Sequence, residues 1–325
     1  MNPLSSAFGA VVKARNALYD RGIIGAESLK WPVISIGNLS VGGSGKTPFT
    51  ILLGEELLKR KLAFDILSRG YKRQSSGVKL VEPNGSALEF GDEPLLMAEK
   101  LRVPVIVGED RAAAGRFAEK MFEELRPAHG DTWFHLLDDG FQHRRLARAF
   151  DIVLVNEEDL DDRLLPLGRL REPLQALERA DAIVIPEAMS ADRLATFGKP
   201  IWRVRRCLDI RLDKLPARPI VLCGIAKPER FFTDLRRARI EVVTKVTFTD
   251  HHRYSNSDVQ HLLRLRDRHK SEGFLVTEKD AINLRPYRAD LEPLVPIPLK
   301  MEWHHAERDI DAMLANIKEK RQSLH

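Results

Sequence analysis

One stretch, SVGGSGKT at residues 40–47, constrains the fold of this chain more than any other. It nearly matches the phosphate-binding loop G-x-x-x-x-G-K-[ST], with Ser40 in the place of the first glycine. An apolar run at residues 32–38 precedes the loop, and an amphipathic stretch at residues 48–62 follows it. A strand before the loop and a helix after it are the setting that the motif requires. The sequence therefore predicts a nucleotide site rather than a glycine-rich turn that binds nothing.

In such a loop, backbone N–H groups and the start of the following helix surround the phosphates of a nucleotide. Lys46 is predicted to neutralise the γ-phosphate, and the hydroxyl of Thr47 to bind Mg²⁺. Ser40 does not oppose this assignment, because the first glycine mainly serves the geometry of the turn. The residues expected to bind the nucleotide are Gly42, Gly43, Ser44, Gly45, Lys46 and Thr47.

Short apolar runs, loops rich in glycine or aspartate and stretches with helical spacing alternate along the chain. This order is typical of a parallel sheet covered by helices. We expect an α/β fold with a P-loop domain at residues 1–210, a connection around residues 202–215, and a second, smaller α/β domain at residues 211–325. The expected strands are residues 32–38, 64–70, 103–110, 134–140, 151–156 and 180–186 in the first domain and 219–224, 245–252 and 273–280 in the second.

The composition is that of an ordinary globular protein, with 43% apolar and 30% charged residues. Lys and Arg exceed Asp and Glu by 52 to 47, which mildly favours anionic partners. The arginine pairs are short and lack interleaved aromatic residues, so we expect no nucleic-acid partner. The two cysteines have no metal or redox spacing, and we find neither a spanning apolar run nor a secretory signal. We therefore expect a protein that stays inside the cell.

Two adjacent aspartates, Asp138 and Asp139, end the apolar run that begins at Phe134. A P-loop protein needs a carboxylate at the end of a neighbouring strand for the Mg²⁺ shell. A single aspartate at a strand end is more often a turn residue, but two beside a P-loop favour the metal role. Both are candidate ligands, and Asp138 is the favoured one.

Two familiar P-loop classes do not fit. Partitioning ATPases with a deviant loop carry a lysine directly before the two glycines, where this chain has Val41. The guanine-reading motif of GTPases is N/T-K-x-D, and TEKD at residues 277–280 has Glu278 in the lysine position. The remaining alternatives are a kinase with a small-molecule acceptor and an ATPase switch that controls a binding partner.

A series of motifs runs in order from about residue 30 to 285: PVISIGNLSVGGSGKTPF, LSRGYKR, GDEP, GEDR, LLDDGFQHRRLARAFD, LLPLGRLREP, GIAKPERFF, FTDHHRYS and TEKDAINL. This series resembles the tetraacyldisaccharide 4'-kinase family. In that family the P-loop begins with a residue other than glycine, as it does here at Ser40.

The resemblance implies a RecA-like P-loop domain, a smaller C-terminal domain that closes over the site, and ATP with Mg²⁺. It implies transfer of the γ-phosphoryl group to the 4'-hydroxyl of a tetraacylated glucosamine disaccharide 1-phosphate, in lipid A biosynthesis. The partners would be this acylated lipid and the inner-membrane surface, with the protein bound peripherally at the cytoplasmic face.

The acceptor hydroxyl must be placed in line with the γ-phosphorus and must lose its proton. Asp92 in GDEP aligns with the family's base, although a helix N-cap is an alternative role. The resemblance pairs Asp92 with a histidine of FTDHHRYS, for which His251 is preferred over His252. If the pair forms, the smaller domain must close over the site.

The family also implies roles for several charged residues. Arg169 and Arg171 in LPLGRLREP are expected to stabilise charge on the transferred group, and Glu172 to contact the metal or a lysine. An exposed ion pair is the alternative for this strip. Arginine suits a phosphate because its planar fork donates two parallel hydrogen bonds. The candidates for contact with the substrate's 1-phosphate or sugar are Arg69, Tyr71 and Arg111.

The N-terminal segment carries a predicted amphipathic helix for membrane docking. Lys13, Asn16 and Asp20 lie roughly opposite its apolar face, which Arg15 interrupts. Such a helix supports reversible attachment to a membrane surface, and an ordinary helix packed on its own domain is the alternative. The apolar face consists of Leu4, Ala7, Phe8, Val11, Ala14 and Leu18.

Overall fold

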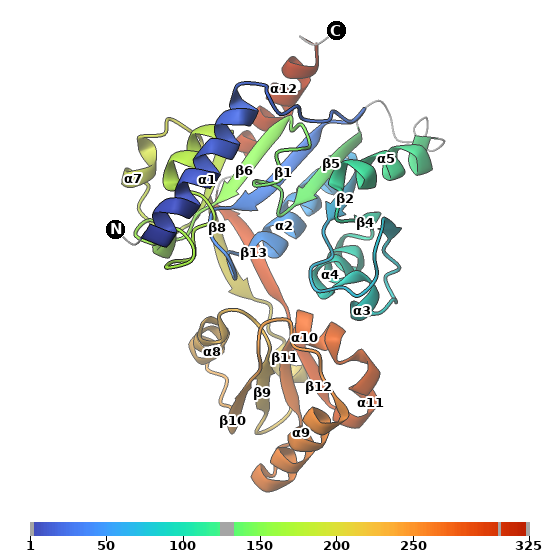
Figure 1. Cartoon of the computed structure of the whole chain (residues 1–325). Helices are drawn as coiled ribbons and strands as arrows, with labels where there is room; N and C mark the ends of the chain where they lie inside the picture. Colours follow the sequence, from blue (N-terminus) through green and yellow to red (C-terminus); the bar gives the residue numbers. More distant parts are fainter. Residues whose placement is uncertain (1–2, 124–132, 305–306, 323–325) are drawn as a thin grey trace.

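The structure, a computed structural model, describes residues 3–123, 133–304 and 307–322. Its strands form a nine-stranded sheet in the order β13-β8-β7-β6-β1-β5-β2-β4-β3 and a four-stranded sheet in the order β10-β9-β11-β12. Figure 1 shows the two sheets in two domains, one above the other. An α/β fold with a large and a smaller domain is thereby confirmed.

The strands and helices have the following bounds. The strands are β1 (Val33–Asn38), β2 (Ala63–Ser68), β3 (Lys79–Leu80), β4 (Val105–Val107), β5 (Trp133–Asp138), β6 (Phe150–Leu154), β7 (Ala182–Pro186), β8 (Ile201–Leu208), β9 (Ile220–Cys223), β10 (Thr244–Thr247), β11 (Phe274–Thr277), β12 (Leu294–Ile297) and β13 (Leu299–His304). The α-helices are α1 (Pro3–Asp20), α2 (Lys46–Lys59), α3 (Ala87–Phe90), α4 (Asp92–Leu101), α5 (Arg111–Phe122), α7 (Asp192–Ala195), α8 (Pro228–Arg237), α9 (Asn256–His269), α10 (Glu278–Asn283), α11 (Arg288–Leu291) and α12 (Glu307–Gln322).

Strand β1 lies in the middle of the large sheet and is buried along its whole length. It pairs in parallel with β5 on one side and β6 on the other. Side chains of alternate residues point to opposite faces, so Ile34 joins a core with Leu53 of α2, whereas Val33 joins a core with Ala114 of α5. The antiparallel pairs β3–β4 and β8–β13 lie at the two edges of this sheet. The sheet thus has a parallel centre covered by helices on both faces.

The small domain is a parallel sheet with its own core on each face. Phe274 and Val276 of β11 pack against residues such as Leu262 of α9. Leu275, on the other face of the same strand, packs with Phe231 of α8. The strands β9, β10, β11 and β12 all run in the same direction. Their carboxyl ends therefore meet at one edge.

The domain boundaries differ from those that the sequence suggested. Residues 202–215 were expected to be a connection, but β8 occupies residues 201–208 and belongs to the large sheet. Strand β13 pairs with β8, and Ile310 and Met313 of α12 lie in the large core. The small domain therefore lies between β8 and β13, and Figure 1 shows these two strands running between the domains. Residues 1–2 and 323–325 of the expected domains lie outside the described residues.

Candidate active site

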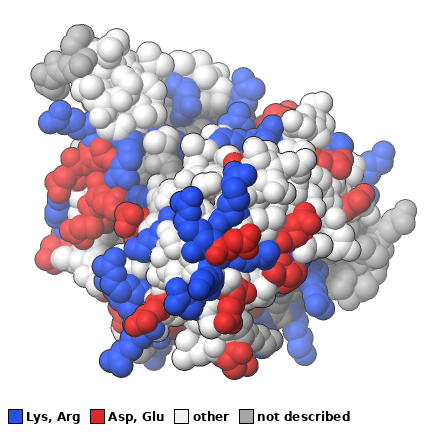
Figure 2. All heavy atoms as spheres, turned by 90° about the horizontal axis from the view of Figure 1, so that it is seen from below, with Lys and Arg blue, Asp and Glu red and all other residues white. Residues whose placement is uncertain are grey.

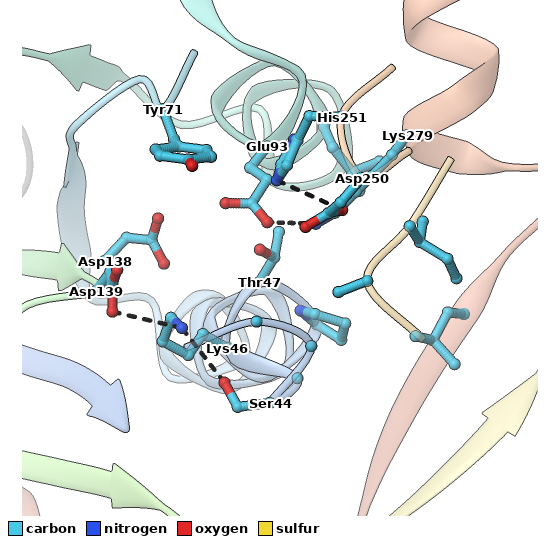
Figure 3. A pocket seen from close by; sticks show the side chains of 18 of the residues that line it. Ser44, Lys46, Thr47, Tyr71, Glu93, Asp138, Asp139, Asp250, His251 and Lys279 are labelled. Carbon is cyan, nitrogen blue, oxygen red and sulfur yellow. Dashed lines mark hydrogen bonds and ion pairs between the residues drawn. The ribbon is translucent and has the colours of Figure 1, made fainter. Parts of the chain in front are cut away.

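The candidate site is a cavity of about 790 Å³ between the carboxyl edges of the two sheets. The loop after β1 and residues that follow β2, β4 and β5 line it from the large domain. Residues that follow β9, β10 and β11 line it from the small domain. Ligands of open parallel sheets bind outside the carboxyl ends of the strands. Here two such edges share one cavity, and Figure 3 shows its labelled side chains.

The loop between β1 and α2 has the backbone geometry of a phosphate cradle. Gly42, Gly43 and Gly45 have φ angles of 76°, 49° and 90°, which side chains other than glycine rarely adopt. Ser40 is not among the residues with positive φ, so this position has no need of a glycine. Ser40 instead forms an antiparallel bridge with Leu170. The missing first glycine therefore leaves the cradle intact.

Lys46 is held at the floor of the cavity. Its Nζ donates hydrogen bonds to Asn38 Oδ1 at 2.9 Å and to Ser44 Oγ at 3.3 Å. It also lies 3.4 Å from a carboxylate oxygen of Asp139. Arg171 Nη1 donates to both oxygens of Asp139, at 3.0 and 3.1 Å. Two cations thus share one carboxylate beside the phosphate loop.

Asp138 ends β5, where the parallel register sets it beside Ile36 of β1. It is buried and accepts a hydrogen bond from Ser68 Oγ at 3.1 Å. Burial, followed by the charges of Glu93 and Asp139, raises the pKa of Asp138 to about 7. Burial is the largest cause of this rise, and the negative charges of Glu93 and Asp139 add to it while Lys46 opposes it. Thr47, also buried, lines the same cavity.

Asp92 and His251 meet across the domain interface. His251 Nδ1 lies 2.9 Å from each carboxylate oxygen of Asp92, and Asn283 Nδ2 donates to Oδ2 at 3.1 Å. Asp92 is the first residue of α4, and its Oδ1 also accepts the N–H of Glu93 at 2.8 Å. The N-cap of α4 is Gly91, so Asp92 does not have the alternative N-cap role. His251 lines the cavity, while Asp92 lies behind it. His252 instead contacts Asp258 at 3.1 Å.

The electrostatics of this pair favour opposite charges. Burial lowers the pKa of His251, but the hydrogen bond and charge of Asp92 outweigh burial and raise it above the ordinary value. Burial raises the pKa of Asp92, and the contacts with His251 and Lys279 reverse this and lower it. His251 has a φ of 54°, a strained conformation for a residue with a side chain. Such strain is typical of functional positions.

A second pair across the interface was not predicted from the sequence. Lys279 forms an ion pair with Glu93, and both side chains line the cavity (Figure 3). Burial lowers the pKa of Lys279, but the charges of Glu93 and Asp92 raise it well above its ordinary value. TEKD was weighed as a guanine motif and counted among the family motifs as TEKDAINL, but Lys279 was given no role. Its position directly after a strand of a parallel sheet is the signal that places it at the site.

Arg69, Tyr71 and Arg111 line the cavity together, beside Asp138. Tyr71 is 53% exposed and packs its ring edge to face with His251, with centroids 5.3 Å apart. Arg111 is buried, and its Nε has no hydrogen-bond partner. A buried guanidinium with an unused donor suits an anionic ligand.

His143 also lines this part of the cavity, although the sequence did not single it out. Burial and the charge of Arg111 lower its pKa to about 4, so the ring is neutral near pH 7. A neutral imidazole can accept one hydrogen bond and donate another.

The strip LPLGRLREP is only partly at the site. Arg171 lines the cavity, but Arg169 and Glu172 do not. Glu172 is fully buried, where it accepts hydrogen bonds from Arg179 at 3.0 and 3.2 Å and from Asn16 at 2.6 Å. The structure thus places Glu172 outside the cavity lining, where Arg179 balances its charge inside the large domain, and offers no support for the expected metal contact.

The expected nucleotide residues and most of the expected substrate and metal residues share the cavity. They are Gly42, Gly43, Ser44, Gly45, Lys46, Thr47, Arg69, Tyr71, Arg111, Asp138, Asp139, Arg171 and His251.

Helix α1 packs one face on the large domain and leaves an apolar stripe uncovered. Gly9 and Val12 are buried, and Ser5 Oγ donates to the carbonyl of Leu164 at 3.1 Å. Asn16, expected on the outer polar face, instead bonds to Glu172 inside the domain. The exposed stripe contains Leu4, Ala7, Val11, Ala14 and Leu18, with Phe8 half-buried.

Comparison with known proteins gives consistent results. The family model described as Tetraacyldisaccharide-1-P 4'-kinase matches residues 1–318. A Tetraacyldisaccharide 4'-kinase of Koribacter versatilis is 46% identical, over 99% of this chain and 100% of its own length. One of Aquifex aeolicus is 38% identical, over 88% of this chain and 89% of its own. A crystal structure described as the "apo" form of LpxK from Aquifex aeolicus in complex with ATP has a TM-score of 0.77 and 36% identity, and covers 97% of each chain.

The parallel sheet, the glycine-rich loop after β1 and the charged cavity have the features of a P-loop nucleotide-binding fold with two α/β domains. The family match then identifies the chain further: it belongs to the tetraacyldisaccharide 4'-kinase family. The resemblance seen in the sequence motifs is confirmed. The identification also decides for a kinase and against an ATPase switch without a small-molecule acceptor.

Proposed function

We propose that the chain transfers the γ-phosphoryl group of ATP to the 4'-hydroxyl of a tetraacylated glucosamine disaccharide 1-phosphate, in lipid A biosynthesis. The observation that carries this proposal is the composition of one cavity. The phosphate loop forms one part of its wall, and His251, bonded to Asp92, forms another. Phosphoryl transfer needs a phosphate cradle and a proton acceptor in one place.

Lys46 and Arg171 are the proposed partners of the transferred phosphoryl group. Both already pair with Asp139 at the edge of the cradle. Cations placed there before reaction stabilise the charge that spreads over the phosphoryl oxygens in the transition state. The backbone N–H groups of residues 42–47 would hold the remaining phosphates.

Mg²⁺ fits the residues beside the cradle. Thr47 supplies a hydroxyl, and Asp138 supplies a carboxylate whose pKa is raised by burial and by neighbouring carboxylates. A divalent cation would offset that concentration of negative charge. Mg²⁺ usually takes one or two protein carboxylates and completes its shell with phosphates and water. When bound, it neutralises charge on the phosphates; we propose Thr47 and Asp138 as its ligands, with Asp139 nearby.

The Asp92–His251 pair is the proposed acceptor of the hydroxyl proton. The carboxylate of Asp92 makes the imidazole more basic and fixes the ring orientation, since both of its oxygens face Nδ1. His251 lines the cavity, and its Nε2 lies 3.8 Å from Asp250 Oδ1, longer than a hydrogen bond. We therefore assign proton acceptance to the pair. His251 alone lacks the carboxylate that makes it more basic, and Asp92 alone does not line the cavity.

The acceptor's 1-phosphate and sugar are proposed to lie against Arg69, Tyr71 and Arg111. Arg111 offers an unused buried donor, and Tyr71 offers an exposed ring on which a sugar face can pack. This group lies on the Asp138 side of the cavity, so the acceptor would approach the phosphates from the large domain's sheet edge.

We propose peripheral attachment to the cytoplasmic face of the inner membrane through the exposed stripe of α1. Within the part of the chain that the structure describes, no helix is long and apolar enough to span a bilayer. Leu4 and Val11 are 64% and 68% exposed, and a helix that lies in the interface can bury such side chains among lipids. The proposed acylated substrate resides in the membrane, so attachment would bring the active site to its substrate.

Nucleic acid is not proposed as a partner. The net charge is only +5, and Figure 2 shows basic side chains interspersed with acidic ones on the face it views. Protein surfaces that bind nucleic acid are more strongly and more uniformly basic than this face.

Product formation tests the proposed function directly. The protein would be incubated with γ-labelled ATP and Mg²⁺, with and without an acylated disaccharide 1-phosphate, and the lipid product separated by chromatography. We expect a labelled lipid from the natural sequence and none from Lys46→Ala. If only free phosphate forms, the proposed reaction is wrong.

A further inference from the structure

Lys227 of the small domain reaches the phosphate loop of the large domain. It follows β9 and precedes α8, and it lines the cavity together with residues 41–47. Its aliphatic stem lies against Gly43, where an added Cβ would be 3.1 Å from its Cγ and 3.3 Å from its Cδ. A cation of the small domain is thus placed at the edge of the phosphate cradle of the large domain.

The ammonium group of Lys227 is bonded to Glu158, which lies beyond the carboxyl end of β6. Glu158 also accepts hydrogen bonds from Arg230 at 2.6 Å and Arg169 at 3.0 Å, and Arg169 reaches Asp162 at 2.8 Å. These ion pairs join three cations to two carboxylates. If Lys227 leaves, Glu158 keeps both arginines, so the departure leaves no unpaired carboxylate.

Two cations of the small domain, Lys227 and Arg230, are bonded to Glu158, and only one of them faces the cavity. Lys227 lines the cavity, whereas Arg230 does not. Glu158 itself has a side chain that is 45% exposed, and solvent weakens ion pairs to such a carboxylate. A phosphate in a partly enclosed cradle offers a lysine stronger charge-assisted hydrogen bonds.

We propose that Lys227 is a phosphate-binding residue for ATP, supplied by the small domain and held beside the P-loop by Glu158 until the nucleotide binds. The inference rests on the proposed ATP site. It adds a residue from outside the P-loop domain to that site. Nucleotide binding would then hold the small domain on the large one, because the phosphates would contact both.

The competing interpretation is an interdomain clasp, in which Lys227 only joins the domains through Glu158. The two interpretations differ in what each partner contributes. In a clasp, loss of Glu158 is at least as harmful as loss of Lys227, because Glu158 also bonds Arg230 of the small domain. In a phosphate contact, loss of Lys227 is harmful and loss of Glu158 is not.

The experiment compares K227Q, E158Q and R230Q in the full chain, with R230Q as the matched control. Calorimetry would give the Kd for ATP with Mg²⁺, and turnover on the acylated acceptor would give kcat and KM. We expect K227Q to weaken ATP binding by about tenfold or more, and E158Q and R230Q to stay within about threefold of the natural sequence. K227R, which keeps the charge, should recover much of the loss.

A loss of ATP binding in E158Q that equals or exceeds the loss in K227Q would overturn the proposal in favour of the clasp, and so would unchanged ATP binding in K227Q. Melting temperatures would show that the variants fold. Absence of lipid product from the natural sequence would refute the proposed function, yet it would leave the ATP-binding comparison intact.

Discussion

Asp92 and His251 are 159 positions apart in the sequence, yet both carboxylate oxygens of Asp92 lie 2.9 Å from Nδ1 of His251. The first residue begins α4 of the large domain, and the second lies in the loop after β10 of the small domain. The contact exists only while the two domains are together. The proposed proton acceptor therefore requires residues of both domains in contact.

The first prediction concerns the dependence of this pair on both members. D92A and H251A should each reduce kcat by about 10² to 10⁴-fold, and the double variant should lose little more than either single variant. The reason is that each substitution removes the same proton acceptor. The measurement is single-turnover transfer of labelled phosphate to the acylated acceptor. H252A, which changes the neighbouring histidine bonded to Asp258, is the matched control and should lose little. Fully additive losses would show that the two residues act independently.

A second prediction follows from the raised pKa of His251. The pair accepts a proton only while His251 is neutral, so kcat should rise with pH and level off above the pKa of that histidine. In D92N the charge that raises this pKa is gone, whereas burial still lowers it. The rising limb of the pH–rate profile should therefore move to lower pH, with a lower plateau. An unchanged limb in D92N would mean that another group controls it.

A third prediction concerns stability and a buried network away from the cavity. His135 Nδ1 lies 2.8 Å from Asp65 and Nε2 lies 3.5 Å from Glu119, with His135 and Asp65 fully buried. Burial lowers the pKa of His135, but the two carboxylates raise it to about 9. H135Q should lower the free energy of unfolding by about 3–5 kcal/mol, because it leaves buried carboxylates unpaired. H261Q, at an exposed histidine, should change it little.

The same network has a defined pH dependence. The folded pKa of about 9 lies above the ordinary value of 6.5, so the folded state binds the proton more tightly than the unfolded state. This stabilisation is complete below the unfolded pKa and is lost as the pH rises through about 9. Urea unfolding at pH 6 and pH 10 should show a smaller difference between H135Q and the natural sequence at the higher pH. A difference that grows with pH would contradict the assignment.

The parallel centre of each sheet could be predicted because buried strands are continuous apolar runs. Each of the nine expected strands overlaps an observed one. The strand β8 was missed because WRVRRCL alternates charged and apolar residues, and this was interpreted as a connection. Such alternation is also the pattern of a half-exposed strand. Its partner β13 is more than ninety positions away, a pairing that no local pattern indicates.

At the site, the P-loop and Asp138 could be predicted because strand ends in a parallel sheet meet at one edge. The pairing of Asp92 with His251 came from family resemblance, since nothing local links them. Lys227 and the Glu93–Lys279 pair were missed, because a sequence does not show which charges face each other across two domains. Glu172 was misplaced for a related reason: its partner is Arg179, seven positions further on, which balances its charge inside the core.

A fourth prediction separates the two aspartates at the end of β5, Asp138 and Asp139. D138N should raise the Mg²⁺ concentration needed for half-maximal activity by more than about tenfold, because it removes a proposed ligand. D139N should mainly lower kcat, since Asp139 orients Lys46 and Arg171. Magnesium titrations of turnover at saturating ATP would distinguish the two effects. Equal Mg²⁺ requirements in both variants would reassign the ligand.

The last prediction concerns α1 and the membrane. Deleting the whole segment is a poor test, because Asn16 bonds to Glu172 and Arg144 Nη2 bonds to Asp20 at 2.7 Å, so deletion also disturbs the large domain. The substitutions L4E, V11E and L18E change only the exposed stripe. Together they should weaken binding to vesicles that contain anionic lipid on the order of 30-fold or more, since burial of each side chain is lost and negative charge is added.

The matched control for the stripe is L212E, which changes a leucine that is 68% exposed in the small domain. Co-sedimentation with vesicles measures attachment, and calorimetry with ATP checks that the nucleotide site is intact. Vesicle binding should fall in the triple variant and stay in L212E, while ATP binds equally well to both. Turnover should fall only for acceptor embedded in vesicles, because acceptor dispersed in detergent needs no docking. If the triple variant binds vesicles as well as the natural sequence does, α1 is an ordinary packed helix and the attachment surface lies elsewhere.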